Sequence, residues 1–138
     1  MKIRMIIGAA SAALAIATAS PTSGHEAGDK VTTNFEQAIP NIPGKSLIAF
    51  IVDYPPGGAS APHRHAKSSF IYAYVVSGSI ESKVNDGATR VYKAGESWSE
   101  PPGATHSISR NASKTEPAKL LAVFVVDTDD KALTTPAK

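Results

Sequence analysis

Short strand-like segments separated by turn residues recur along most of this chain and constrain its fold more than any other feature. Proline, glycine and the sequence Asn85-Asp86-Gly87 interrupt them, and no segment has a convincing helical period. The expected strands cover residues 45–54, 70–76, 79–84, 89–93, 97–100, 106–110 and 120–126. Turns every ~8–12 residues are typical of barrels and sandwiches, so we predict an all-β fold.

Two of these segments are apolar on both faces. Residues 45–54 place apolar side chains on each side of a strand, and residues 120–126 are apolar throughout. Such strands suit a barrel wall that packs inward on the core and outward on a partner. We therefore expect a homodimer.

Three of the four histidines lie in two segments rich in glycine and proline. His63 and His65 point to the same side of a strand, because successive side chains alternate. His106 follows the sharp corner at residues 101–103, whereas His25 lies in a polar N-terminal stretch and is expected to be solvated. Three imidazoles predict a site for one divalent metal ion, with iron, manganese, zinc, copper and nickel all open.

The spacing of these segments resembles the two motifs of the cupin family. The first motif is matched by Gly57 or Gly58, His63, His65 and Gly78, and the second by Gly95, Pro101, Gly103 and His106. The resemblance implies a double-stranded β-helix, a jelly-roll-like barrel. It also implies metal binding by the three histidines and a small-molecule ligand or substrate.

One position departs from the family pattern. The glutamate that usually supplies the fourth ligand is replaced by Ile71, and residues 66–74 contain no carboxylate. Four interpretations stay open: water fills the remaining positions, Glu100 substitutes, Tyr72 or Tyr74 supplies an oxygen, or the metal is lost. Glu100 and Tyr72 are the candidate catalytic residues. Three protein ligands with water is the arrangement of catalytic metals.

The N-terminus resembles a secretory signal peptide. Lys2 and Arg4 precede an apolar run at residues 5–17 that is short for a membrane span, although an anchor helix is the alternative. An A-x-A signal predicts cleavage after Ala19, giving a periplasmic or secreted protein without membrane contact. The expected organisation is a signal peptide at 1–19, an arm at 20–44, a cupin barrel at 45–127 and a tail at 128–138.

Charge and cysteine content exclude several classes of protein. Without Lys2 and Arg4 the chain has twelve basic and twelve acidic residues, and no basic stripe supports nucleic-acid binding. The absence of cysteine excludes disulfides, zinc fingers, iron–sulfur clusters and thiol catalysis.

The sequence thus predicts an exported cupin that acts on a small organic molecule. Iron or copper would favour dioxygenase-like chemistry, and zinc, nickel or manganese would favour hydrolysis or lyase or isomerase chemistry. A metal held by three neutral histidines alone would favour anionic substrates. The alternative is a non-catalytic binding or sensor cupin with a degraded metal site.

Overall fold

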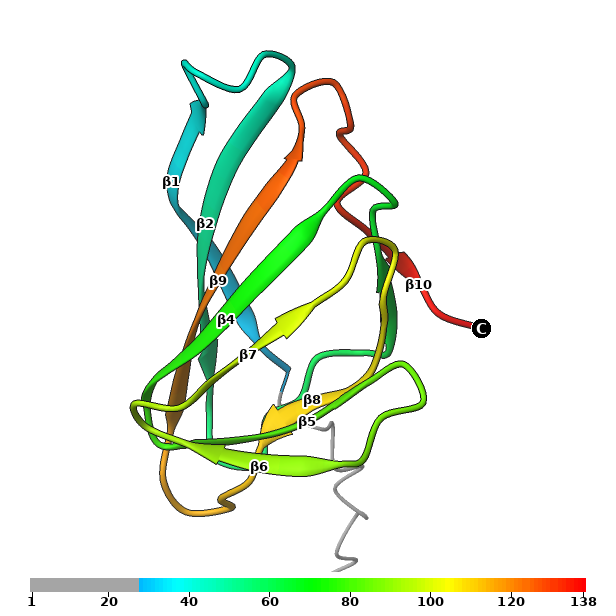
Figure 1. The fold of residues 1–138 in the computed structure, drawn as a ribbon. Coiled ribbons are helices and arrows are strands. Elements are labelled where there is room, and N and C mark those ends of the chain that lie inside the picture. Colours follow the sequence, from blue (N-terminus) through cyan, green and yellow to red (C-terminus); the bar gives the residue numbers. More distant parts are fainter. Residues whose placement is uncertain (1–27) are drawn as a thin grey trace, which may run out of the picture.

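The computed structural model describes residues 28–138, which form two five-stranded antiparallel sheets (Figure 1). From edge to edge, the first sheet contains β1 (Lys30–Ala38), β2 (Lys45–Tyr54), β9 (Ala118–Asp127), β4 (Phe70–Ser77) and β7 (Ser97–Glu100). The second contains β10 (Thr134–Pro136), β3 (His63–His65), β8 (Thr105–Asn111), β5 (Ser79–Val84) and β6 (Arg90–Lys93). The predicted all-β fold is confirmed. Within residues 28–138 no helix is long and apolar enough to cross a membrane.

The core lies between the inner faces of the two sheets. On β4, Ile71, Ala73 and Val75 are buried, whereas the alternate residues Phe70 and Tyr72 are exposed on the outer face. The same period-2 pattern runs along β2 and β9, whose inward residues join these side chains. β2, β4 and β9 therefore each contribute one face to the core and one to the outside of the barrel.

Gly78 marks the point where the chain passes from β4 in the first sheet to β5 in the second. Its φ is +71°, and a Cβ there would lie 2.5 Å from the carbonyl oxygen of Pro117. Glycine meets both demands because it has no side chain. The closing glycine of the first histidine motif is thus required by the bend itself.

The predicted central strands agree closely with the structure, but two edge strands were not predicted. The expected arm at 20–44 contributes β1, which pairs with β2 from Lys30 opposite Asp53 to Ala38 opposite Ser46. The expected tail at 128–138 contributes β10, which pairs with β3. Every residue of β1 and β10 is exposed, so neither has a buried periodic face in its sequence. The expected signal peptide at 1–19 lies outside the described residues.

Candidate metal centre

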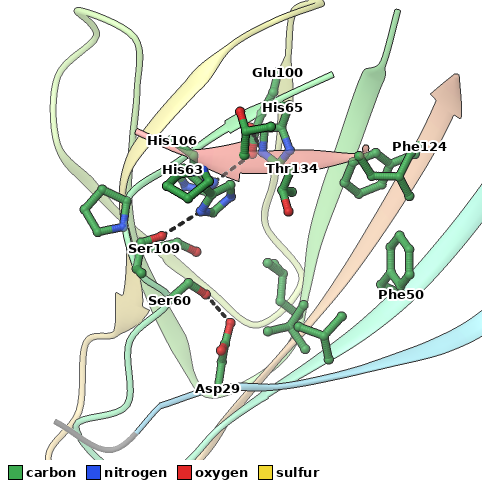
Figure 2. Close-up of a pocket in the computed structure, with 18 of the residues that line it drawn as sticks. Asp29, Phe50, Ser60, His63, His65, Glu100, His106, Ser109, Phe124 and Thr134 are labelled. Atoms are coloured by element: carbon green, nitrogen blue, oxygen red, sulfur yellow. Dashed lines mark hydrogen bonds and ion pairs between the residues drawn. The ribbon is translucent and has the colours of Figure 1, made fainter. Parts of the chain in front are cut away.

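The three predicted histidines converge on the inner side of the second sheet (Figure 2). His63 and His106 are direct partners on the paired strands β3 and β8, and His65 lies two residues further along β3. One nitrogen from each ring lies within 4.8 Å of the others. The structure therefore brings the whole predicted triad to one point.

Backbone bonds on both sides hold the histidine strand. The corner at residues 101–103 is tied to the histidine segment by the amide of Gly103, which donates to the carbonyl of Ala66 at 3.1 Å. The amide of His65 donates to the carbonyl of Ala104 at 2.9 Å. On the other side, β10 pairs with β3 and places Thr134 opposite His65. The histidine strand is therefore supported by a neighbour on each side.

A carboxylate reaches the same point from the first sheet. Glu100 ends β7 and is only 2% exposed, and its direct partner on β4 is Ile71. Directly opposed residues in an antiparallel pair have Cβ atoms about 4.5–5.5 Å apart. Ile71 stands where the cupin motif usually has its glutamate. Glu100 therefore supplies a carboxylate from β7, the strand next to the one that carries Ile71.

The contacts of Glu100 leave part of it unsatisfied. Trp98 Nε1 donates to Oε1 at 3.0 Å, and the same oxygen lies 3.3 Å from His106 Nδ1. Oε2 lies 2.9 Å from His65 Nε2, but neither atom has a hydrogen bond of acceptable geometry, and His65 Nδ1 has none either. Unsatisfied buried polar atoms are costly. A cation bound here would give a partner to one nitrogen of His65 and to Glu100 Oε2, so these residues fit a metal ion.

Further hydrogen bonds orient the other two histidines. His63 Nδ1 lies 2.8 Å from the carbonyl oxygen of Ala61, so it donates there and leaves Nε2 as the free ligand atom. His106 Nε2 lies 2.8 Å from Ser82 Oγ, which leaves its Nδ1 on the side of Glu100. Bonds of this kind fix the rings of metal-binding histidines.

The site favours the neutral forms of His63 and His106 beside an ionised Glu100. Burial lowers the pKa of His106 to about 4 and also holds the pKa of His63 below its usual value. Burial alone would raise the pKa of Glu100, but its contacts with His65, His106 and Trp98 outweigh that effect and lower it. These are the protonation states that metal ligands require.

The structure does not bring Tyr72 to the site. It is 44% exposed on the outer face of β4, between the inward-facing residues Ile71 and Ala73, and Tyr74 shares that outer face. The face that the two tyrosines share is the opposite face from the metal centre. Tyr72 is therefore not placed to act as a ligand or a catalytic group.

Two supporting residues were missed by sequence reasoning. Ser82 lies on β5 and Ala61 acts through its carbonyl, so neither carries a local signal that would link it to the histidines. Trp98 and Glu100 alternate onto the same face of β7, and the hydrogen bond between them shows that they are in contact.

A cavity of about 540 Å³ opens beside the triad and Glu100. Its walls include Phe50, Val52, Leu120 and Phe124 from the first sheet, with residues 133–136 from the C-terminal segment. The volume is within the range of small-molecule sites. The candidate metal centre is thus open to a small ligand.

Comparisons with known proteins agree with this site. A family model described as a cupin domain matches residues 50–124. A germin-like protein of Arabidopsis thaliana, subfamily 2 member 2, is 32% identical over 101 residues, which cover 70% of this chain and 45% of that protein. The chain thus spans less than half the length of this curated relative.

Solved structures show the same fold. Oxalate oxidase in complex with glycolate is similar with a TM-score of 0.54 and 29% identity, over 77% of this chain and 54% of that chain. A protein of Klebsiella pneumoniae with a double-stranded β-helix domain has a TM-score of 0.62 and 21% identity, over 86% and 90% of the two chains. With two paired histidine segments in this double-stranded β-helix and a family match over more than half its length, the chain belongs to the cupin superfamily.

Proposed function

We propose that this protein is an exported single-domain cupin that binds one divalent transition metal and acts on a small organic molecule in the adjoining cavity. One observation carries the proposal: three converging imidazoles and a buried carboxylate that lacks a full set of partners surround one point. Neutral histidines and an ionised carboxylate suit iron, manganese, zinc, copper and nickel alike.

The residues have distinct roles in this proposal. His63, His65 and His106 hold the metal, and Glu100 supplies the carboxylate from the neighbouring strand. Trp98 holds one oxygen of Glu100, which leaves the other oxygen for the metal. A metal bound here would supply Lewis-acid or redox chemistry beside the cavity. The apolar wall formed by Phe50 and Phe124 would exclude water from a bound ligand.

The similarity to oxalate oxidase bound to glycolate supports a small oxygen-rich substrate. Glycolate is a small hydroxy acid whose oxygens can bind a metal, as a substrate of this class would. Dioxygenase-like chemistry is then expected with iron or copper, and lyase or isomerase chemistry with zinc, nickel or manganese.

A non-catalytic binding or sensor cupin is the second candidate. Ile71, at the position of the family glutamate, is the observation that favours it. In that case a ligand would bind in the cavity without turnover.

Elemental analysis of native protein purified without chelator or affinity tag tests metal binding directly. We expect about one equivalent of metal, lost in the His63→Ala, His65→Ala double variant, because only His106 and Glu100 of the four proposed ligands would remain. No metal in the native protein, even after soaking with the five candidate ions, would contradict the proposal. Turnover of small hydroxy and dicarboxylic acids by the loaded protein then separates an enzyme from a binding protein.

The outer face of the first sheet supports a homodimer. Two rows of apolar side chains cross β2, β9 and β4 as direct strand partners: Leu47, Val125 and Phe70, and Ile51, Leu121 and Tyr74. Ion pairs lie at either end of this face, Lys45 with Asp127 at 2.5 Å and Lys119 with Asp53 at 2.6 Å. An apolar centre with a charged rim is the usual anatomy of a protein interface.

Sedimentation velocity tests the homodimer. Tyr72→Glu places a charge on this outer face, and we expect it to convert a dimer to a monomer while leaving the metal content unchanged. A monomeric native protein would contradict the dimer.

Export is proposed from the N-terminal sequence. Protein recovered from the periplasm or medium should begin at Ser20, as read by N-terminal sequencing. An intact Met1 in the exported fraction would contradict cleavage.

A further inference from the structure

The cavity has a second polar end, away from the metal centre. Asp29 and Ser60 line it there, and Figure 2 shows them across the cavity from Glu100 and His65. Ser60 Oγ donates to Asp29 Oδ2, and Tyr54 Oη lies 2.7 Å from Ser60 Oγ and 2.8 Å from Ser109 Oγ. Four side chains thus form one continuous hydrogen-bonded chain along the wall.

Counting donors fixes the direction of this chain. The carboxylate of Asp29 accepts, so Ser60 uses its one hydroxyl hydrogen there. Tyr54 must then donate to Ser60, and Ser109 must donate to Tyr54. Burial raises the pKa of Tyr54, which keeps its hydroxyl protonated and able to donate. The hydroxyl hydrogens of Ser109, Tyr54 and Ser60 therefore all point toward Asp29. Tyr54 and Ser109 are buried, so the far end of this hydrogen-bonded chain is fixed in the protein.

In the described part of the chain, the charged side chains that line the cavity are all acidic. Its charged side chains are the carboxylates of Asp29 and Glu100, and neither lysine nor arginine is among the described residues that line it. Within residues 28–138, Asp29 forms no ion pair with a basic side chain, and Ser60 satisfies only one of its oxygens. The lining also includes apolar side chains, Val52 and Leu120 among them.

We propose that Asp29 is a specificity-determining residue that selects ligands carrying a protonated amine at the end remote from the histidines. This inference rests on the proposed function, since the other end of the ligand must face the metal centre. A ligand with a carboxylate at one end and an ammonium group at the other complements both ends of the cavity. Charge-assisted hydrogen bonds from the ammonium to the free oxygen of Asp29 would supply the selectivity.

Paired probes with the same number of carbons test the proposal. Isothermal titration calorimetry on metal-loaded protein compares ω-amino carboxylates of three to six carbons with the unsubstituted carboxylates that have the same number of carbons. We expect the amino series to bind about tenfold more tightly at its best length, because Asp29 is exposed and solvent weakens its pull. Asp29→Asn should reduce this preference to near unity while binding of the plain carboxylates stays unchanged.

Two further variants serve as controls. Ser60→Ala removes the bond that orients Asp29 and should lower the preference partway. Asp86→Asn makes the same charge change in the exposed turn after β5, outside the cavity lining, and should keep the full preference.

The outcomes separate this inference from the proposed function. Equal binding of both series by the native protein, no binding of either, or a preference that survives Asp29→Asn would each overturn the role of Asp29. Elemental analysis of the same samples judges the metal centre independently. Melting temperatures and metal content of Asp29→Asn that match the native protein would show that any lost preference is not caused by misfolding.

Discussion

The two sides of the metal centre are built in different ways. The histidine side belongs to the second sheet, where two short motifs set His63, His65 and His106 on adjacent strands. The carboxylate side belongs to the first sheet, where Glu100 reaches the site through the pairing of β7 with β4. Long-range strand pairing positions both sides, β3 with β8 for the histidines and β7 with β4 for Glu100, but only the histidines belong to recognisable sequence motifs. The comparison suggests that a ligand type can move to a neighbouring strand while the site keeps its composition.

Breaking the histidine side should have the largest effect. We expect His65→Ala to weaken metal binding by more than about 100-fold, because it removes a ligand and leaves Glu100 Oε2 without its nearest neighbour. Competition with a metal-sensitive dye measures the affinity. Arg64→Ala, which alters the outward-facing residue between the two histidines, is the matched control and should leave the affinity unchanged.

Low pH should destabilise the folded, metal-free protein through His106 on the histidine side. Burial lowers the pKa of His106 to about 4 in the folded state, against 6.5 ordinarily. Below pH 6.5 the unfolded chain therefore binds a proton at this residue that the folded chain does not bind. Stability is therefore lost as the pH falls from about 6.5 to 4, by about 3 kcal/mol in total. Urea unfolding at several pH values measures this slope. His106→Asn should flatten it, and an equally steep slope in that variant would contradict the assignment.

Breaking the carboxylate side should have a smaller effect. Glu100→Gln removes the negative charge but keeps the shape, and we expect metal affinity to fall by about 10- to 100-fold. The triad remains, so some binding should persist.

A double variant that moves the carboxylate from β7 to β4 tests whether the two positions are equivalent. Because Ile71 lies directly opposite Glu100, the double variant Ile71→Glu, Glu100→Gln places a carboxylate at the usual cupin position. We expect it to recover much of the affinity lost in Glu100→Gln alone. Ile71 is 1% exposed, so circular dichroism must first show that the variant is folded. A folded variant with no recovery would indicate that the two positions are not equivalent.

The smallest expected effect comes from the support of Glu100. Trp98→Phe removes the donor to Oε1 but keeps an aromatic ring, and we expect metal affinity to fall by about tenfold. The dye competition used for His65→Ala measures it. An affinity equal to that of the native protein would mean that Trp98 packs without orienting the carboxylate.

The sequence predicted the histidine side far better than the carboxylate side. The central strands follow from alternation and turn residues, and the triad follows from the resemblance of the two histidine segments to the cupin motifs. The direct pairing of Glu100 with Ile71 depends on the register between β7 and β4, which no local pattern encodes, so Glu100 could only be one of several alternatives. The placement of Tyr72 was wrong for a different reason: alternation shows which residues share a face but not which face is inside. β1 and β10 lack a buried face and are defined by backbone pairing with β2 and β3.

Anomalous diffraction from crystals of metal-loaded protein, recorded at the absorption edge of the bound element, tests the two-sheet metal centre most directly. We predict one peak that lies about 2.0–2.2 Å from a nitrogen of each of the three histidines and from an oxygen of Glu100. A peak coordinated by the histidines alone, with Glu100 turned away, would contradict the role of the first sheet. The absence of any peak at the histidines would contradict the metal centre itself.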